Sequence, residues 1–115
     1  MPYTLGFFDP DDLADHFDKH ILQKRELDAA DENEYLDLAD SFLGEDLNPI
    51  TTHECQRRCA DGSDGDKLRF NHITEEFGCL SNDNHIRTYF IPDRAEHGHA
   101  SNYLYFTHSC GLVLC

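Results

Sequence analysis

Basic residues are scarce in this chain of 115 residues, which has 9 Lys and Arg against 23 Asp and Glu and a formal net charge of −14. An electrostatic field of this sign disfavours nonspecific binding to nucleic acid or to anionic lipid. Long apolar runs are also absent, since no stretch approaches the roughly 20 residues that span a bilayer. The start has no basic segment followed by an apolar run, which would mark a signal peptide. These absences favour a cytoplasmic protein with no membrane partner.

The negative charge is concentrated in the first half of the chain. Residues 1–50 contain 14 acidic and 3 basic residues, whereas residues 51–115 contain 9 acidic and 6 basic residues. A surface of this kind favours basic partners, including the nucleic-acid-binding grooves of other proteins. The simpler interpretation is that these carboxylates only solvate the exposed faces of helices.

The chain contains an odd number of cysteines: Cys55, Cys59, Cys79, Cys110 and Cys115. Without a signal peptide we expect their thiols to be reduced, although the last two could pair on oxidation. Cys79 lies in an apolar segment and is expected to be a small core residue. The spacing of His53, Cys55 and Cys59 matches no zinc pattern of paired cysteines. We therefore expect no metal ion and no other cofactor.

Two helices are predicted between residues 9 and 44. Asp9 can cap the first helix, and Pro10 suits its first position. Asp31 can cap the second helix, with Glu34 three residues later as in a capping box. Gly44 then ends it.

The first helix carries two histidines beside its buried stripe. Leu13, Phe17 and Ile21 recur with the spacing of one helix face and are expected to face the core. His16 and His20 are also four residues apart, on a neighbouring stripe. They should lie together at the edge of the buried face, where a site can be both supported and open.

The second half of the chain reads mainly as strands. Three are predicted, over residues 66–71, 76–81 and 85–91, with a tight hairpin turn before the last. Residues 52–59 are expected to form a short helix, and residues 102–107 a strand or a short helix. The order predicts one α+β domain over residues 1–115, with N-terminal helices (9–44) packed on a small, mostly antiparallel sheet (66–106) and a tail or edge strand (107–115).

Alternation assigns the side chains of these strands to two faces. Lys67 and Arg69 are expected to share one face of their strand. In the last strand, Arg87 is expected to lie opposite a face that carries Ile86, Thr88 and Phe90.

This order of segments resembles the barnase/EndoU/colicin E5–D/RelE-like (BECR) superfamily of toxin ribonucleases, in particular its small polymorphic-toxin and phage-associated domains. The resemblance covers most of residues 9–106 and involves a helical His-x-x-x-His element, a second helix and a strand triplet. The matching segments are His16–His20, Glu34–Leu43, Arg69–Asn71, Glu76–Gly78 and Ile86–Phe90, followed by Pro92–Asp93, His97–Gly98 and Asn102–Phe106.

The resemblance implies a ribonuclease site. The pair of Lys19 and His20 is similar to the catalytic Lys-His of the colicin D type, and Thr88 and Phe90 take the place of its Ser-x-aromatic element. Arg69 is carried over on the same basis. Histidine suits proton transfer because its unperturbed pKa is about 6.5, and guanidinium groups grip phosphate in a forked geometry.

The expected activity is therefore cleavage of RNA, with tRNA as the favoured substrate, by attack of the ribose 2′-OH to give a 2′,3′-cyclic phosphate. The catalytic candidates are His20, His16, Arg69 and Thr88. The substrate-binding candidates are Lys19, Lys67, Arg87 and Phe90, of which the phenyl ring could stack a base. As a toxin, the protein would have an immunity protein as partner.

Three other interpretations remain open. His16 and His20 could hold a metal ion with Asp12 or Asp15, although the His-Glu-x-x-His signature is absent. The chain could instead be a non-catalytic acidic inhibitor that occupies a basic nucleic-acid-binding groove, for example of a CRISPR effector, as anti-CRISPR proteins and nucleic-acid mimics do. It could also be an acidic immunity protein.

Overall fold

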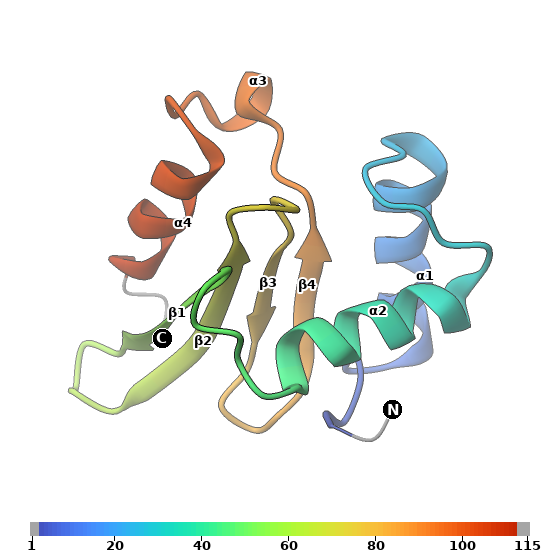
Figure 1. Cartoon of the computed structure of the whole chain (residues 1–115). Coiled ribbons are helices and arrows are strands. Elements are labelled where there is room, and N and C mark those ends of the chain that lie inside the picture. The colour runs from blue at the N-terminus through green and yellow to red at the C-terminus, as the bar shows by residue number, and fades with distance from the viewer. Residues whose placement is uncertain (1–2, 113–115) are drawn as a thin grey trace.

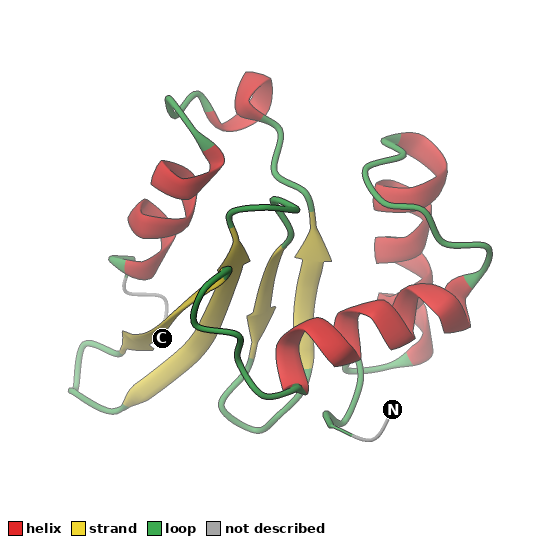
Figure 2. Cartoon of the chain, viewed as in Figure 1, coloured by secondary structure: helices red, strands yellow, loops and turns green. Residues whose placement is uncertain are grey.

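Helices cover both faces of one antiparallel sheet (Figures 1 and 2). The computed structural model describes residues 3–112. Its elements are α1 (Pro10–Phe17), a π-helix η1 (Asp18–Gln23), α2 (Glu32–Gly44), β1 (Thr52–Arg58), β2 (Asp64–Asn71), β3 (Phe77–Leu80), β4 (Ile86–Phe90), α3 (Arg94–His97) and α4 (Asn102–Cys110). Within residues 3–112, no helix is long and apolar enough to cross a membrane. The predicted α+β class is confirmed.

Both helix starts follow the capping signals in the sequence. The Asp9 carboxylate accepts the backbone N–H of Asp12 at 2.7 Å, and the Asp31 carboxylate accepts that of Glu34 at 2.9 Å. These bonds satisfy donors that the first turn of a helix leaves free. Helix α2 ends at Gly44 as predicted.

The sheet has the strand order β1-β2-β3-β4, and all neighbouring pairs are antiparallel. The prediction of a short helix over residues 52–59 is wrong, because this segment pairs along β2 from Thr52 opposite Asn71 to Arg58 opposite Asp64. Tertiary pairing outweighs a weak local preference here. Of the two alternatives for residues 102–107, the helix is confirmed.

A β-bulge interrupts the pairing of β4 with β3. Cys79 lies opposite Thr88, but the next residue of β3, Leu80, lies opposite Ile86. The extra residue, Arg87, breaks the alternation of side chains. The prediction that Ile86 shares a face with Thr88 and Phe90 is therefore wrong, as is the placement of Arg87 on the face opposite to Thr88.

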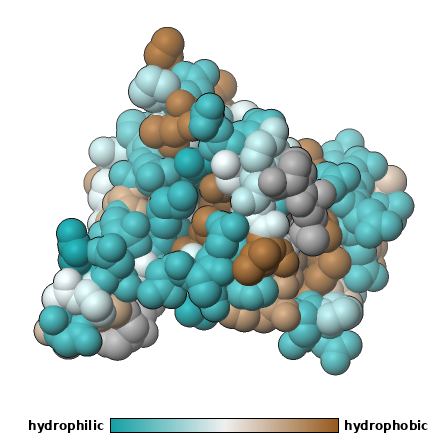
Figure 3. All heavy atoms as spheres, turned by 90° about the horizontal axis from the view of Figure 1, so that it is seen from below, coloured by the Kyte–Doolittle hydropathy of each residue, from teal (hydrophilic) through white to brown (hydrophobic). Residues whose placement is uncertain are grey.

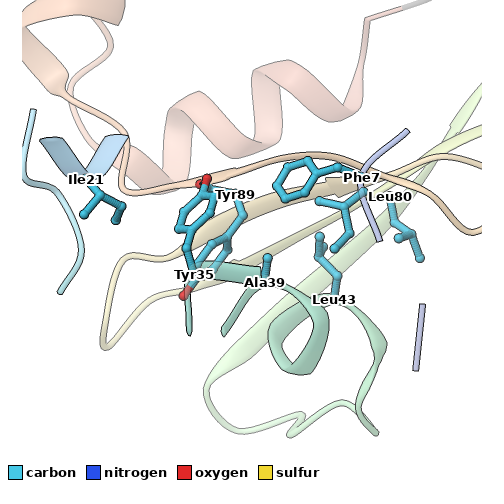
Figure 4. Packing of buried hydrophobic residues seen from close by; sticks show 8 residues of the cluster. Phe7, Ile21, Tyr35, Ala39, Leu43, Leu80 and Tyr89 are labelled. Carbon is cyan, nitrogen blue, oxygen red and sulfur yellow. The ribbon is translucent and has the colours of Figure 1, made fainter. Parts of the chain in front are cut away.

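Two hydrophobic cores lie on opposite faces of the sheet. The core on the α2 side consists of Phe7, Ile21, Tyr35, Ala39, Leu43, Leu80, Ile86 and Tyr89 (Figure 4). The core on the α4 side consists of Leu68, Phe70, Phe77, Cys79 and Phe106. Helix α2 approaches the sheet so closely that a Cβ at Gly78 would lie only 2.7 Å from the Leu43 Cδ2.

A disulfide joins the edge strand to the last helix. Cys55 of β1 and Cys110 of α4 are bonded, with their Cα atoms 6.1 Å apart. The prediction that these thiols are reduced is therefore wrong, as is the alternative pairing of Cys110 with Cys115; the latter residue lies outside the described part of the chain. Spacing along the sequence gives no indication that β1 and α4 lie side by side. Cys79 is a buried free thiol as predicted, and burial raises its pKa to about 12.

Hydrophilic residues cover most of the face that Figure 3 shows, and hydrophobic residues are exposed between them. Polar side chains thus lie beside exposed apolar ones on this face, as on most protein surfaces.

Candidate active site

His20 lies in a π-helical turn rather than in the α-helix that the spacing predicts. Helix α1 ends at Phe17, and residues 18–23 continue it as η1, where the N–H of Lys24 donates to the carbonyl of Lys19 at 3.0 Å. Only 3% of the surface of His20 is exposed. Turns of π-helix are rare in proteins, and those that occur are often found at functional sites.

The chain turns back after η1 and brings Glu26 against His20. Arg25 adopts a left-handed backbone conformation with φ of 53°. The Glu26 N–H then donates to the His20 carbonyl at 2.9 Å, and the Glu26 Oε2 lies 2.8 Å from the His20 Nδ1. When Glu26 is ionised its carboxylate can only accept, so Nδ1 then carries the proton. In this state the other ring nitrogen, Nε2, is a proton acceptor.

Burial favours the neutral forms of both partners. Desolvation lowers the pKa of His20, and the neighbouring His16, Lys19 and Lys24 lower it further. Desolvation raises the pKa of Glu26. Removing an ion from water disfavours its charged form, which explains both directions. His20 is therefore a neutral imidazole, held in one orientation, at neutral pH.

His16 stacks beside His20, with ring centroids 5.7 Å apart. Its Nε2 lies 3.5 Å from the Asp12 carboxylate. Its Nδ1 is buried and has no hydrogen-bond partner within residues 3–112. Burial lowers the pKa of His16, whereas Asp12 acts in the opposite direction.

A cavity of about 280 Å³ lies between η1, the carboxyl end of β4 and helix α3. Its walls are formed by His16, Lys19, His20, Lys24, Thr88, Phe90, Pro92, Asp93, Glu96, His97 and Tyr105. Five of the eight predicted site residues meet here: His16, Lys19, His20, Thr88 and Phe90. Segments that are about 70 residues apart in the sequence thus share one site.

Arg69 does not line this cavity, so the prediction that it acts with His20 as a catalytic residue is wrong. It is buried on the α2 side of the sheet, where its Nε donates to Glu54 at 2.6 Å. Its Nη1 donates to the carbonyls of Phe42 and Glu45 at 3.1 and 2.7 Å. These acceptors occupy the guanidinium, and they connect the end of α2 to the sheet.

The other two predicted residues also lie outside the cavity walls. Lys67 is on the same strand as Arg69 and not among the lining residues. Arg87 is directed to Asp66 of β2, with its Nε 2.8 Å from the carboxylate. The bulge in β4 leaves Arg87 on the same side of the sheet as Thr88, but its side chain is directed to β2 and not to η1.

Phe90 supports the histidine as well as lining the cavity. Its ring stacks on that of His20, with centroids 4.9 Å apart and an interplanar angle of 11°. The edge of Phe77 packs against it, with centroids 5.4 Å apart. We infer that Phe90 fixes the imidazole plane, which leaves it little free surface for stacking a base.

Sequence reasoning missed Glu26 and most of the opposite wall. Glu26 lies six residues after His20, a spacing with no helical meaning, and only the π turn and the left-handed Arg25 bring the two together. His97 contributes a fixed ring: its Nε2 contacts Asn102 at 2.9 Å, and its Nδ1 accepts the N–H of His99 at 3.0 Å. The sequence pair His97-Gly98 does not reveal these two partners, the Asn102 side chain and the His99 N–H.

The cavity is locally neutral in a strongly acidic chain. Two lysines and two acids line it, and Lys24 forms an ion pair with Glu96 of α3. Asp93 caps α3 by accepting the N–H of Ala95 at 2.9 Å. In the part of the chain that the structure describes, Lys19 has no ion-pair partner, and the Thr88 hydroxyl has no hydrogen-bond partner. A cation and a hydroxyl are thus available beside the imidazole.

Comparison with models of protein families found no match, and searches of curated proteins and of solved structures found none either. The resemblance to toxin ribonucleases therefore stays a prediction from the residues. Of residues 3–112, no group of three or more His, Cys, Asp or Glu is arranged to hold a metal ion.

Proposed function

We propose that this cavity is the active site of an endoribonuclease that needs no metal ion and cleaves RNA through attack of the ribose 2′-OH. The observation that carries the proposal is the buried pair of His20 and Glu26 beside a cavity whose walls also hold Lys19, without an ion-pair partner among residues 3–112, and the Thr88 hydroxyl, without a hydrogen-bond partner among them. These are the groups that cleavage of a phosphodiester requires.

Each residue has a role that follows from its position. His20 Nε2 removes the proton of the 2′-OH, and Glu26 stabilises the imidazolium that forms, as a carboxylate does for a catalytic histidine. His16, whose Nε2 lies 3.5 Å from the Asp12 carboxylate, is the neighbouring group for protonation of the leaving 5′-oxygen. Lys19 stabilises charge on the phosphoryl oxygens, and the Thr88 hydroxyl donates to one of them. The products are a 2′,3′-cyclic phosphate and a 5′-hydroxyl, with tRNA as the favoured substrate.

The test is incubation of the purified protein with total RNA in EDTA, followed by analysis for cyclic-phosphate ends. We expect His20→Ala to lower the rate by about 10²–10⁴-fold, the usual contribution of a general base. His108→Ala is the matched control, because His108 is exposed on α4 and away from the cavity. Near-UV circular dichroism shows whether each variant keeps its fold. An active His20→Ala variant, or an inactive wild-type protein, contradicts the proposal.

A second candidate function is non-catalytic inhibition of a basic nucleic-acid-binding protein, and the distribution of charge favours it. The net charge is −14, and several cations that could contact nucleic acid are neutralised within the protein, as in the pairs Arg58–Asp64 and Arg69–Glu54. An immunity protein would use the same electrostatics. Here Asp11, Asp12 and Asp15 changed together to Asn should weaken a salt-sensitive complex with a basic partner, and RNA would stay intact.

A further inference from the structure

A second cavity, of about 370 Å³, adjoins the candidate active site on the α4 side of the sheet. Thr88, Phe90 and Tyr105 line both cavities, so the two spaces are neighbours. The remaining walls come from Arg57, Asp66, Leu68, Phe77, Cys79, Arg87 and Ser109. A chain-like substrate bound at Thr88 can therefore extend over both.

Two guanidinium groups share one carboxylate in this second cavity. The Asp66 Oδ2 lies 2.8 Å from the Arg87 Nε and 3.7 Å from the Arg57 Nη1. The Cys79 thiol also contacts this oxygen, at 3.5 Å. The Asp83 carboxylate also acts on Arg87, so two positive charges face two negative charges here. In a chain with a net charge of −14, such a local balance is an exception.

The fold holds both arginines in place. Arg57 is buried, and its Nε donates to the Ser109 carbonyl of α4 at 2.8 Å. The bulge in β4 turns Arg87 to the side of the sheet that carries Asp66, and its guanidinium lies over the Phe8 ring, 5.3 Å from the centroid. The Arg87 side chain is 50% exposed and remains accessible to a ligand. A preorganised guanidinium pair loses little entropy when it binds an anion.

We propose that Arg57 and Arg87 form a subsite for a second phosphate of the substrate, next to the phosphate that is cleaved at His20. The inference rests on the proposed ribonuclease function and extends it to the substrate class. The preferred substrate would be an RNA strand with at least two phosphates, rather than a dinucleotide with one. A guanidinium group can donate two parallel hydrogen bonds to phosphate oxygens, and the Asp66 carboxylate contacts both arginines. Arg87 thus has a binding role, but at a neighbouring phosphate.

The test compares cleavage of a dinucleoside monophosphate with that of trinucleoside diphosphates extended on either side. For the wild-type protein we expect one extended substrate to have a kcat/KM about tenfold higher than the dinucleotide, the value of one charge-assisted contact. In Arg87→Gln this ratio should fall to about one. Arg58→Gln, which removes an equal charge from an exposed ion pair, should leave the ratio unchanged. A ratio that is the same in Arg87→Gln and in wild type overturns the subsite.

A binding measurement separates the subsite from the ribonuclease proposal. Inorganic phosphate is added to the ¹⁵N-labelled wild-type protein, and the Nε–H signals of Arg57 and Arg87 are followed by NMR. Saturable shifts of both signals in a protein that does not cleave RNA would support the anion subsite and reject the enzyme. Cleavage of RNA with unshifted signals and an unchanged substrate ratio would reject the subsite and leave the enzyme in place.

Discussion

Replacing Glu26 by Gln tests the role of the buried pair most directly. Gln keeps the shape of the side chain and an oxygen that accepts the His20 Nδ1–H, so the ring should keep its orientation. The variant loses the negative charge that stabilises His20 once it has taken a proton. Both side chains are shielded from solvent, with exposed fractions of 4% and 9%, so screening is weak. The difference between a charge-assisted and a neutral hydrogen bond is about 1.4 kcal/mol, which corresponds to a rate about tenfold lower.

The pH dependence gives this prediction a second readout. Burial raises the pKa of Glu26, so the carboxylate is ionised only above that raised value and becomes neutral as the pH falls through it. The wild-type rate should therefore decline on the acid side, where Glu26 loses its charge. The amide of the variant is neutral at every pH, so this decline should be absent. The ratio of the two rates should be largest at alkaline pH and approach one in acid.

The assay is single-turnover cleavage of an end-labelled RNA in EDTA, measured from acid to alkaline pH with enzyme in excess. Glu32→Gln is the matched control, because it removes the same charge from an exposed position in the first turn of α2. A Glu26→Gln variant that keeps its fold and cleaves at the wild-type rate across this range would refute the assignment of Glu26 and the proton pathway built on it.

Three further predictions concern stability, each measured by urea unfolding. Leu43→Ala should lower the free energy of unfolding by about 3–5 kcal/mol, because this fully buried side chain fills the space against Gly78; a loss below 1 kcal/mol would contradict the packing described. Asp40→Ala should lower the free energy of unfolding by about 3 kcal/mol, because the buried carboxylate accepts two backbone N–H groups and the Thr4 hydroxyl. Asp37→Ala, at an exposed position of the same helix, is its control. Replacing Cys55 and Cys110 together by Ala should lower the free energy of unfolding by about 4 kcal/mol, the loop-entropy value for their separation of 55 residues; equal stability of this variant and the wild-type protein would argue against this bond.

Local signals in the sequence predicted the helices and the class of the fold well. The caps at Asp9 and Asp31 act within one turn, so neighbouring residues suffice to predict them. The prediction of a helix at residues 52–59 was wrong because this segment is stabilised by a distant one. It forms β1 by pairing with β2, and that pairing depends on the fold of the whole chain. The disulfide depends on the same long-range packing.

The candidate site was predicted in part for the same physical reasons. His16 and His20 share a helical stretch, and Thr88 and Phe90 share a strand, so each pair was predictable as a unit. Arg69 was misplaced because alternation gives the two faces of a strand but not which helix covers each face. Glu26 was missed because its approach depends on a π turn, a feature with no established signal in the residues themselves.

The extra residue in β4 has a consequence for how this chain tolerates change in length. One residue fewer at Arg87 would restore strict alternation and leave Ile86 and Tyr89 on the α2 side and Thr88 and Phe90 on the other side. One residue fewer at Tyr89 would instead move either Thr88 or Phe90 to the α2 side and away from the histidines. Single-residue deletions should therefore be accepted in the hairpin loops and at Arg87 but not at Tyr89, and a library of such deletions scored for soluble expression would show this difference.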